Sequence, residues 1–466
     1  MATILDRRRT AVAPVRGRRA RTDAMVRLGA ASLLWLSLLL VTYWWVVDRG
    51  VQDLTGWPSA LLSSGRVTGL VASVLLLAQV LLMARLPVLE RAFGQDRLAH
   101  VHRLVGFTSF TLMVTHVVLI VWGYAGGSVP HVPAETWRMT WHDPGMLLAV
   151  VGTACLVMVV ATSIRWARAR LRYESWHLLH LYAYLGAGLA LPHQLWTGQE
   201  LVGSHAKTVF WWTAWAGCAA AVVVFRLGVP VRRNLRHRIH VTGVVAEGDG
   251  VVSVHLGGRE LHRLRAEAGQ FFVWRFLAGD GRSRGNPYSL SAAPTGDTLR
   301  ITVKDLGDQS ARLKDLVPGT RVLVEGPYGR LGDRARTRDR VAFIGAGVGI
   351  TPLRSLAEGM AYAPGEAVML HRYRDRPLMQ RELEHLAAER GLEMLWLPGA
   401  RRSSDSWLGA HVGRADDLTA LVSWVPDIAQ RDVYVCGPAA WTAQVVATLR
   451  TAGLTPDHIH LESFSW

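Results

Sequence analysis

The first half of the chain contains apolar stretches whose length is typical of membrane helices. Six of them approach the roughly 20 residues that an α-helix needs to cross a bilayer. They lie near residues 26–47, 61–84, 100–122, 144–164, 176–196 and 208–227. Half of the 466 residues are hydrophobic although the formal net charge is +16, because apolar and charged segments are segregated along the chain. We therefore predict an all-α bundle of six membrane helices over residues 26–228.

Arginine placement predicts the orientation of these helices. Arginines precede the first predicted span and follow the second, fourth and sixth. They are Arg7, Arg8, Arg9, Arg16, Arg18, Arg19, Arg85, Arg91, Arg97, Arg165, Arg168, Arg170, Arg172, Arg232, Arg233, Arg236 and Arg238. The opposite loops have little beyond Arg49, Arg138 and Lys207. The positive-inside rule then places both termini, the basic tail 1–25 and the whole second half in the cytoplasm. The basic charge reflects topology, which argues against nucleic-acid binding.

Four histidines form two pairs within the third and fifth predicted spans. The fourteen-residue step from His102 to His116 corresponds to roughly 21 Å along a helix and returns to nearly the same face. The thirteen-residue step from His180 to His193 returns less well, and Pro192 lies where it distorts a helix. Neutral imidazole is a common axial ligand of haem iron. The pairs predict two stacked b-type haems, and the alternative is hydrogen bonding between helices.

The second half has the pattern of a soluble protein with two domains. Short β-branched and aromatic runs such as GQFFVWRFL and LRITVKDL predict an antiparallel β-barrel over residues 235–335. Strands and helices then alternate from VAFIGAGVGITP onward, which predicts an α/β domain with a parallel sheet over residues 336–466. The three cysteines are isolated from one another, which excludes a four-cysteine iron–sulfur cluster and a zinc ribbon.

Five short motifs follow one another in this half: NPYSL, GPYG, GAGVGITP, CGP and the terminal ESFSW. A barrel and an α/β domain that carry them in this order resemble the ferredoxin-NADP reductase family. Behind six spans with paired histidines, the chain is similar to the ferric reductase and NADPH oxidase superfamily over roughly residues 28–466. The resemblance implies that the barrel binds FAD and that the α/β domain binds NADPH.

The resemblance also implies where the flavin is held. It places Tyr288 against the isoalloxazine or the ribityl chain and Ser289 near the flavin N5. Asn286 stands where many of these reductases have an arginine that neutralises the flavin pyrophosphate. Three nearby cations are candidates for that charge: Arg282, Arg284 and Lys304. The implied flavin-binding residues are Asn286, Pro287, Tyr288, Ser289, Leu290, Lys304, Gly307, Ser310 and Gly326.

The glycine loop GAGVGITP is typical of a nucleotide site, because glycines let a pyrophosphate approach the N-terminus of a helix. By resemblance, Cys436 lies beside the nicotinamide, and Glu462 and Phe464 match the acidic and ring-stacking positions of the family. Either Phe464 or Trp466 would cover the flavin. The implied nucleotide-site residues are Gly345, Gly347, Gly349, Thr351, Cys436, Gly437 and Pro438. Phe464 and Trp466 complete the implied cofactor-binding set. The implied catalytic residues are Ser289, Cys436, Glu462 and Phe464.

Arg372 and Arg374 follow the second predicted strand of the α/β domain. An NAD enzyme often has an acidic residue there for the ribose hydroxyl, whereas arginine suits a 2′-phosphate. The two arginines therefore favour NADPH. Asp375 beside them leaves NADH open, and a solvated basic loop is the alternative without a nucleotide.

Together these features predict an integral enzyme of the cytoplasmic membrane. NADPH would reduce FAD, and electrons would pass through the inner and then the outer haem to an extracytoplasmic acceptor. The favoured acceptor is a ferric complex. A flavin is needed because a hydride carries two electrons and a haem accepts one. Ile120 stands one turn beyond His116, where superoxide-forming oxidases tend to have a histidine, and this favours metal reduction. Arg66 could pair with a haem propionate or attract an anionic chelate.

Three alternatives remain at this stage. The chain could be a superoxide-forming NADPH oxidase. It could be a membrane flavoprotein that donates electrons to a periplasmic partner protein. A non-enzymatic alternative is a haem-bearing sensor with a degenerate reductase tail, which predicts no turnover of NADPH. Oxygen, quinones and metals other than iron stay open as acceptors, and neither protein partners nor the oligomeric state is indicated.

Overall fold

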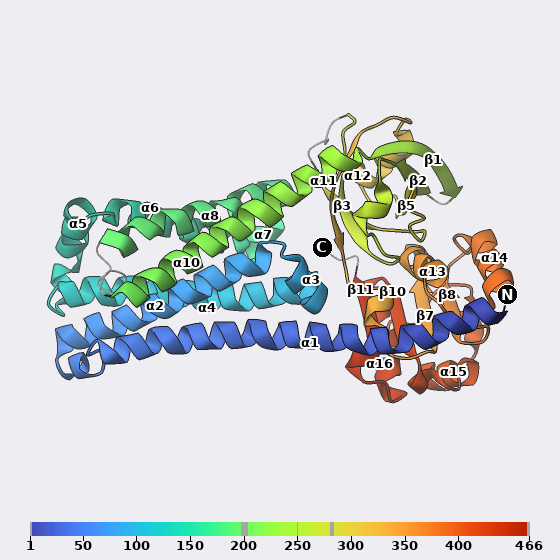
Figure 1. The fold of residues 1–466 in the computed structure, drawn as a ribbon, viewed down its shortest axis with the longest axis horizontal. Helices are drawn as coiled ribbons and strands as arrows, with labels where there is room; N and C mark the ends of the chain where they lie inside the picture. The colour runs from blue at the N-terminus through green and yellow to red at the C-terminus, as the bar shows by residue number, and fades with distance from the viewer. Residues whose placement is uncertain (1, 197–203, 249, 280–283, 464–466) are drawn as a thin grey trace. The chain divides into compact units, whose positions relative to one another are not determined.

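The computed structural model describes residues 2–196, 204–248, 250–279 and 284–463 (Figure 1). The chain divides into two compact units. The helical unit comprises residues 26–89 and 96–227, and the mixed unit comprises residues 1–25, 90–95 and 228–466. The N-terminal domain is therefore helical, as predicted, and the second half contains the predicted β and α/β segments.

The helices of the first half have the following bounds: α1 (Ala2–Val47), α2 (Trp57–Met83), α3 (Pro87–Phe93), α4 (Gln95–Tyr124), α5 (Val132–His142), α6 (Met146–Ser163), α7 (Arg165–Arg170), α8 (Tyr173–Trp196), α10 (His205–Ala221), the π-helical segment Val222–Gly228 and α11 (Val229–His237). Five helical segments are long and apolar enough to cross a membrane by length and composition: Arg21–Val47, Trp57–Met83, Arg97–Tyr124, Met146–Ser163 and His205–His237. The remaining predicted span forms α8, which falls outside this set because its histidines and Gln194 lower its hydropathy. The six-span count stays a prediction.

Helices α6 and α8 lie side by side, and their backbones are in close contact (Figure 1). A Cβ atom added to Gly152 would lie 2.7 Å from the carbonyl oxygen of Gly186, and one added to Gly186 would lie 2.8 Å from that of Gly152. Only glycine on both helices allows this crossing, as in small-residue contacts between membrane helices. A second cluster joins Val41 of α1 to α2 and to the buried Trp211 of α10. These contacts set the positions of α2, α6 and α8 around the predicted haem ligands.

Six antiparallel strands occupy the predicted barrel region of the mixed unit. They are β1 (His240–Gly248), β2 (Val251–Gly257), β3 (Phe271–Phe276), β4 (Asn286–Ser289), β5 (Thr298–Lys304) and β6 (Val322–Tyr328). Strands β1, β2 and β5 pair in one sheet, and β4, β3 and β6 pair in the other. Single bridges, His240 with Arg321 and Leu290 with Ile301, connect the sheets at both edges. The interior is filled by apolar side chains such as Phe272 and Trp274.

Helix α11 includes the predicted start of the barrel region at residue 235. The Asn234 side chain of α11 donates to the Val324 carbonyl at 2.9 Å and accepts from the Val324 N–H at 2.8 Å. Arg233 also donates to the carbonyl of Gly326. Helix α11 is thus bonded to β6, and the compact unit begins at residue 228 in this region.

The α/β domain is a five-stranded parallel sheet in the order β11-β10-β7-β8-β9. Its strands are β7 (Val341–Ala346), β8 (Ala367–Arg372), β9 (Glu393–Leu397), β10 (Asp432–Gly437) and β11 (Ile459–Ser463). Helices α13 (Ile350–Gly359) and α14 (Gln380–Arg390) cover one face, and α15 (Asp417–Trp424) and α16 (Ala439–Thr451) cover the other. The parallel sheet matches the prediction from alternating strands and helices.

A buried carboxylate lies at the amino end of β10. Asp432 is fully buried and accepts hydrogen bonds from the N–H groups of Thr337 and Arg338, each at 2.6 Å. The Nε2 of His460 is 3.0 Å from the same carboxylate. Burial raises the pKa of Asp432, but these hydrogen bonds outweigh it, so the pKa lies below its usual value. The carboxylate ties β10 to the start of β7 and to β11.

We expect Asp432→Asn to lower the free energy of unfolding at pH 7 by about 1.5 to 3 kcal/mol, because hydrogen bonds to a charged group are lost. The folded pKa is depressed, so this stabilisation is present above the unfolded value of about 3.9 and is lost as the pH falls through the folded value. Thermal unfolding followed by circular dichroism should show the wild-type advantage at pH 7 and its loss in acid. Asp457→Asn, at an exposed position, is the matched control. A difference that persists unchanged in strong acid would contradict this role.

Candidate functional site

The inner pair of predicted haem ligands is brought together by α4 and α8. The ring centres of His102 and His180 are 6.1 Å apart, with 64° between the ring planes. A metal–imidazole bond is about 2 Å long, so two imidazoles that share one metal ion have ring centres about 6 Å apart. The two side chains therefore fit a single iron between them.

The second ring nitrogens of these histidines contact groups of neighbouring helices. His102 Nδ1 is 3.2 Å from the carbonyl oxygen of Gln79, and His180 Nδ1 is 3.4 Å from Oγ of Ser163. In the outer pair, His116 Nδ1 is 2.7 Å from the carbonyl oxygen of Gly65. A carbonyl oxygen only accepts, so Nδ1 of His102 and of His116 must carry the proton. Nε2 is then left as the lone-pair donor, the usual arrangement of a metal-ligating histidine.

The outer pair, His116 on α4 and His193 on α8, is surrounded by close-packed glycines. A Cβ atom on Gly69 would lie 2.5 Å from His116 Nδ1, and one on Gly145 would lie 2.8 Å from the backbone nitrogen of His193. His193 is also within electrostatic range of His116. The helices thus leave room for these side chains where a larger residue would displace them.

Two further residues of the helical unit bear on the predicted acceptor side. The guanidinium of Arg66 is 3.2 Å from Oδ2 of Asp53 and donates to the carbonyl of Asp48 at 3.5 Å. This cation therefore already has an acidic partner. Ile120 packs on α2, where a Cβ atom on Gly65 would lie 2.8 Å from its Cδ1. The position one turn beyond His116 is apolar and filled.

The predicted flavin motif occupies β4 and its end. Ser289 pairs with Phe271 of β3, and the carbonyl of Tyr288 accepts from Trp274 Nε1 at 2.9 Å. Burial raises the pKa of Tyr288 to about 12, so its phenol stays protonated. Asn286 and Pro287 are partly exposed, whereas Leu290 is fully buried in the barrel core. Leu290 is therefore placed as a core residue.

The loop after β5 carries the other predicted flavin contacts. Ser310 Oγ accepts from the Leu306 N–H and donates to the Gly307 carbonyl, both at 2.8 Å. Its hydroxyl thus closes the loop, and Lys304 beside it is exposed. Gly326, on β6, has a positive φ of 134°. Of the candidate cations, Arg282 lies outside the described residues.

The nucleotide loop and the CGP turn meet at the carboxyl edge of the parallel sheet. Gly345 lies one residue before the end of β7, and Gly347 and Gly349 lead into α13, where Thr351 Oγ1 donates to the Val348 carbonyl at 2.9 Å. A Cβ atom on Gly349 would lie 2.4 Å from the carbonyl oxygen of Cys436 and 2.9 Å from the Cα of Gly437. Pro438 then precedes α16. The two motifs are therefore in direct backbone contact.

Residues from all five strands form one row across this edge. Glu462 pairs with Cys436, and Cys436 with Gly345. The row continues from Gly345 to His371 and then to Trp396. Cys436 is fully buried, and burial together with the Glu462 charge raises the pKa of its thiol well above the usual value. The row brings together two of the predicted catalytic residues, whereas Phe464 and Trp466 lie outside the described residues.

Three arginines gather where β8 and β9 end. Arg372 Nη2 donates to the Gly399 carbonyl at 3.4 Å. Burial lowers the pKa of Arg372, and the charges of Arg401 and Arg374 lower it further. Such mutual repulsion is typical of a site that receives an anion. The sequence patterns pointed only to Arg372 and Arg374 as candidates for the 2′-phosphate. Arg401 follows the next strand of the sheet, and this position could have indicated it as a third candidate.

His371 is a further residue of this row that none of the sequence motifs indicates. Its side chain is fully buried against the rings of Tyr373 and Trp396, at 5.5 and 5.8 Å between centres. Neither ring nitrogen has a hydrogen-bond partner among the described residues. Burial lowers its pKa to about 3, so the imidazole is neutral at physiological pH.

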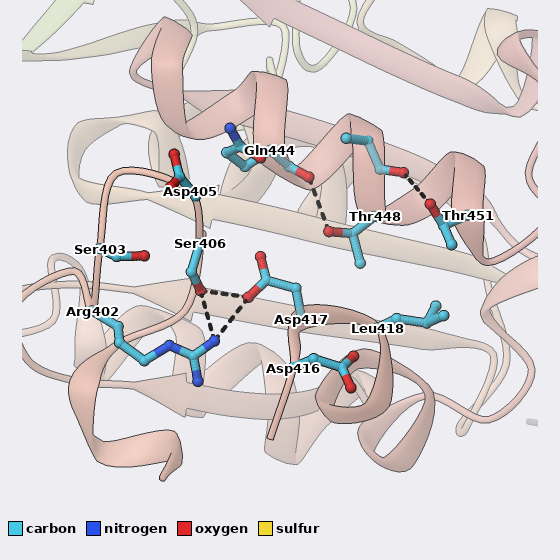
Figure 2. Close-up of a pocket in the computed structure, with 11 residues that line it drawn as sticks. Arg402, Ser403, Asp405, Ser406, Asp416, Asp417, Leu418, Gln444, Thr448 and Thr451 are labelled. Atoms are coloured by element: carbon cyan, nitrogen blue, oxygen red, sulfur yellow. Dashed lines mark hydrogen bonds and ion pairs between the residues drawn. The ribbon is translucent and has the colours of Figure 1, made fainter. Parts of the chain in front are cut away.

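A pocket of about 440 Å³ opens elsewhere in the α/β domain (Figure 2). It is lined by Arg402, Ser403, Asp405, Ser406, Asp416, Asp417, Leu418, Gln444, Ala447, Thr448 and Thr451. Figure 2 shows Arg402 and Ser406 turned towards Asp417, to which both are bonded. None of the predicted site residues lines it, so it is separate from the row at the carboxyl edge.

Comparisons with known proteins find a matching family model for one segment in each half of the chain. Residues 68–191 match the ferric reductase like transmembrane component, and residues 343–446 match the oxidoreductase NAD-binding domain. The glycine betaine monooxygenase reductase subunit of Chromohalobacter salexigens is 27% identical over 241 residues, which is 50% of this chain and 65% of that protein. The ferredoxin reductase component of 3-ketosteroid-9-alpha-monooxygenase from Mycolicibacterium smegmatis is 31% identical over 211 residues, 43% of this chain and 56% of that protein.

The chain spans less than two thirds of the length of these curated relatives. Among solved structures, a flavohemoglobin from Malassezia yamatoensis with bound FAD and heme is 16% identical. The match covers 90% of this chain and 99% of that chain, with a TM-score of 0.42.

Proposed function

We propose that this chain, which joins a ferric reductase-like transmembrane component to an oxidoreductase NAD-binding domain, transfers electrons across a membrane. Cytoplasmic NADPH would be the donor, FAD and two b-type haems the carriers, and an extracytoplasmic ferric complex the acceptor. The observation that carries the proposal is the inner pair, whose ring centres are 6.1 Å apart and thus fit one iron. His102 and His180 would hold the inner haem, and His116 and His193 the outer haem.

The residues of the mixed unit would bind and orient the donor. Gly345, Gly347 and Gly349 would admit the pyrophosphate to the N-terminus of α13. Cys436 and Glu462, neighbours in the row at the carboxyl edge, would flank the nicotinamide. When bound, FAD supplies the conversion of a hydride into single electrons that a haem can accept. Tyr288 and Ser289 of β4 would orient the flavin. Residues 304–310 would provide further contacts to it.

Reduction of metal complexes is favoured over superoxide formation by the residues near the outer pair. Ile120 fills the position one turn beyond His116 and offers no hydrogen bond to a bound oxygen species. Arg66 would contribute positive potential on the acceptor side, reduced by its pairing with Asp53. An oxidase, and a flavoprotein that serves a periplasmic partner protein, are the alternative functions. The arginine distribution supports cytoplasmic termini and a location in the cytoplasmic membrane.

The absorption spectrum of the purified protein, taken before and after anaerobic addition of NADPH, tests this function. We expect flavin bleaching followed by the bands of reduced low-spin haem, with two haems per chain. A spectrum that contains haem but does not change with NADPH would instead support the haem-bearing sensor with a degenerate reductase tail.

We expect a preference for NADPH that depends on Arg374 and Arg401. Losing a charge-assisted contact to the 2′-phosphate costs about 1.5 to 3 kcal/mol, so Arg374→Ala or Arg401→Ala should raise the KM for NADPH about tenfold or more. The KM for NADH should barely change. Steady-state kinetics with both nucleotides measures this, with Arg381→Ala, an exposed arginine of α14, as the control. Equal losses with NADPH and NADH would argue against 2′-phosphate recognition.

A further inference from the structure

A charged network crosses the seam between the barrel and the α/β domain. Arg300 of β5 donates to both carboxylate oxygens of Glu382 on α14, at 2.9 and 2.8 Å. Arg354 of α13 approaches the same carboxylate, with Nε 2.9 Å from Oε2. Arg354 also donates to Glu358 at 2.5 Å. We call Arg300, Arg354, Glu358 and Glu382 the seam network, and its two positive and two negative charges balance.

The seam network holds the chain segment that follows the flavin motif. The carbonyl of Ser291 accepts from Arg300 Nη2 at 3.0 Å and from Arg354 Nη1 at 3.3 Å. Arg300 Nε donates to Ser291 Oγ at 3.2 Å. Glu358 accepts from the Ala293 N–H at 2.5 Å. Residues of both domains therefore hold one segment of the barrel.

This segment is adjacent to the places where hydride donor and acceptor would lie. Ser291 is two residues beyond Ser289 of the flavin motif, and Arg354 is three residues beyond Thr351 at the start of α13. Backbones meet at the same seam, since a Cβ atom on Gly359 would lie 2.7 Å from Cβ of Ala268. The network thus links the flavin strand to the nucleotide helix through side chains. The close contact of Gly359 with Ala268 beside it leaves little room for the two domains to shift against each other.

The network is sufficiently shielded from water to act as a rigid link. The side chains of Arg300 and Arg354 are 12% and 9% exposed, and that of Glu382 is 32% exposed. Burial raises the pKa of Glu382, but the Arg300 hydrogen bonds and the Arg354 charge outweigh it, so its pKa is below the usual value. Bidentate arginine–carboxylate pairs fix geometry as well as add energy. Removing one partner leaves the other charges partly buried without compensation.

We propose that Glu382, through Arg300 and Arg354, is a positioning residue that sets the approach of the nicotinamide to the flavin. The inference deepens the proposed function and rests on it. In the step concerned, the C–H bond of the dihydronicotinamide breaks, and the hydrogen with both electrons is transferred to the oxidised flavin. Hydride transfer is sensitive to the separation and alignment of the two rings, and a misplacement of 1 Å can cost about a hundredfold in rate.

The test is Glu382→Gln in the full-length protein loaded with FAD. Glutamine keeps the size of the side chain but removes the charge and one acceptor oxygen. We expect the anaerobic rate of flavin reduction at saturating NADPH to fall between about tenfold and a hundredfold, with little change in FAD content or in KM. The deuterium isotope effect with NADPH labelled at the transferred position should rise. Glu384→Gln is the matched control, because Glu384 lies on the same helix and, among the described residues, its side chain accepts a hydrogen bond from Gln380 Nε2 at 2.8 Å.

A second variant separates positioning from a general loss of structure. Arg300→Gln should reproduce the slow flavin reduction, and the double variant Arg300→Gln/Glu382→Gln should be no slower than the slower single variant, because both act through one link. If Glu382→Gln loses FAD, Arg300→Gln with intact FAD provides the measurement. Wild-type rates in both single variants, or losses that multiply in the double variant, would overturn the inference. Absence of flavin reduction in the wild type would instead overturn the proposed function.

Discussion

His116→Ala is expected to remove the outer haem and to leave the inner haem reducible by NADPH. His116 is held by its Nδ1 contact to the Gly65 carbonyl and by the tight packing of Gly69, and alanine has no imidazole to place there. Loss of a partner that merely orients a metal ligand costs about 10- to 100-fold in metal affinity, and loss of the ligand itself should exceed this. Haem content per chain should fall by half, and reduction of an external ferric chelate should fall with it.

The pyridine haemochrome assay and the NADPH-reduced spectrum measure these two effects. His131→Ala serves as the control, because His131 is exposed in the segment before α5 and is not part of either pair. His193→Ala should behave as His116→Ala does. If both variants keep the haem content of the wild type, the assignment of the outer ligands is wrong.

Gly349→Ala is expected to abolish electron input from NADPH. The added Cβ atom would lie 2.4 Å from the carbonyl oxygen and 2.6 Å from the carbonyl carbon of Cys436, both of them backbone atoms. The nucleotide loop or the CGP turn must then move, and displacement of about 1 Å at a reacting centre costs about a hundredfold. Flavin reduction by NADPH should fall by at least that factor. Chemical reduction of the haems by dithionite should be unaffected, because it bypasses this edge of the sheet.

Gly243→Ala is the control for the presence of an extra methyl group in the mixed unit. No heavy atom lies within 4 Å of a Cβ built at Gly243 in β1, so NADPH-driven reduction should persist in this variant. Normal flavin reduction in Gly349→Ala would show that the contact between the glycine loop and the CGP turn does not position the nucleotide.

Features with a local signal were predictable from the sequence. Short runs rich in β-branched residues indicate strands such as β2 and β5, and the glycine loop after an apolar run indicates the turn from β7 into α13. Helical periodicity also places His102 and His116 on one face of α4, whereas the 6.1 Å approach of His102 to His180 depends on how α4 and α8 pack. No local pattern in the sequence marks the glycines that let α6 approach α8, because their role depends on the partner helix.

Features that depend on distant contacts could not be predicted in this way. Strand β11 pairs with β10 at the edge of the sheet, but its five residues are too few to give a clear strand pattern in the sequence. Arg300 and Glu382 are separated by 82 positions and meet only because the barrel and the α/β domain pack together. The pairing of Arg66 with Asp53 likewise depends on how the loop before α2 folds back. For α8, the predicted ligands His180 and His193 themselves lower the hydropathy by which a span is recognised.

Electron transfer across the membrane is tested most directly in inside-out vesicles that contain the protein and a ferric chelate trapped in the lumen. With NADPH added outside, where the mixed unit would face, we expect the trapped chelate to be reduced. The His116→Ala protein should reduce it far more slowly, although NADPH should still reduce its inner haem. The opposite result would be full NADPH oxidation with superoxide formed in the lumen and a chelate that stays ferric once superoxide is scavenged. That outcome would contradict metal reduction and establish the oxidase alternative in its place.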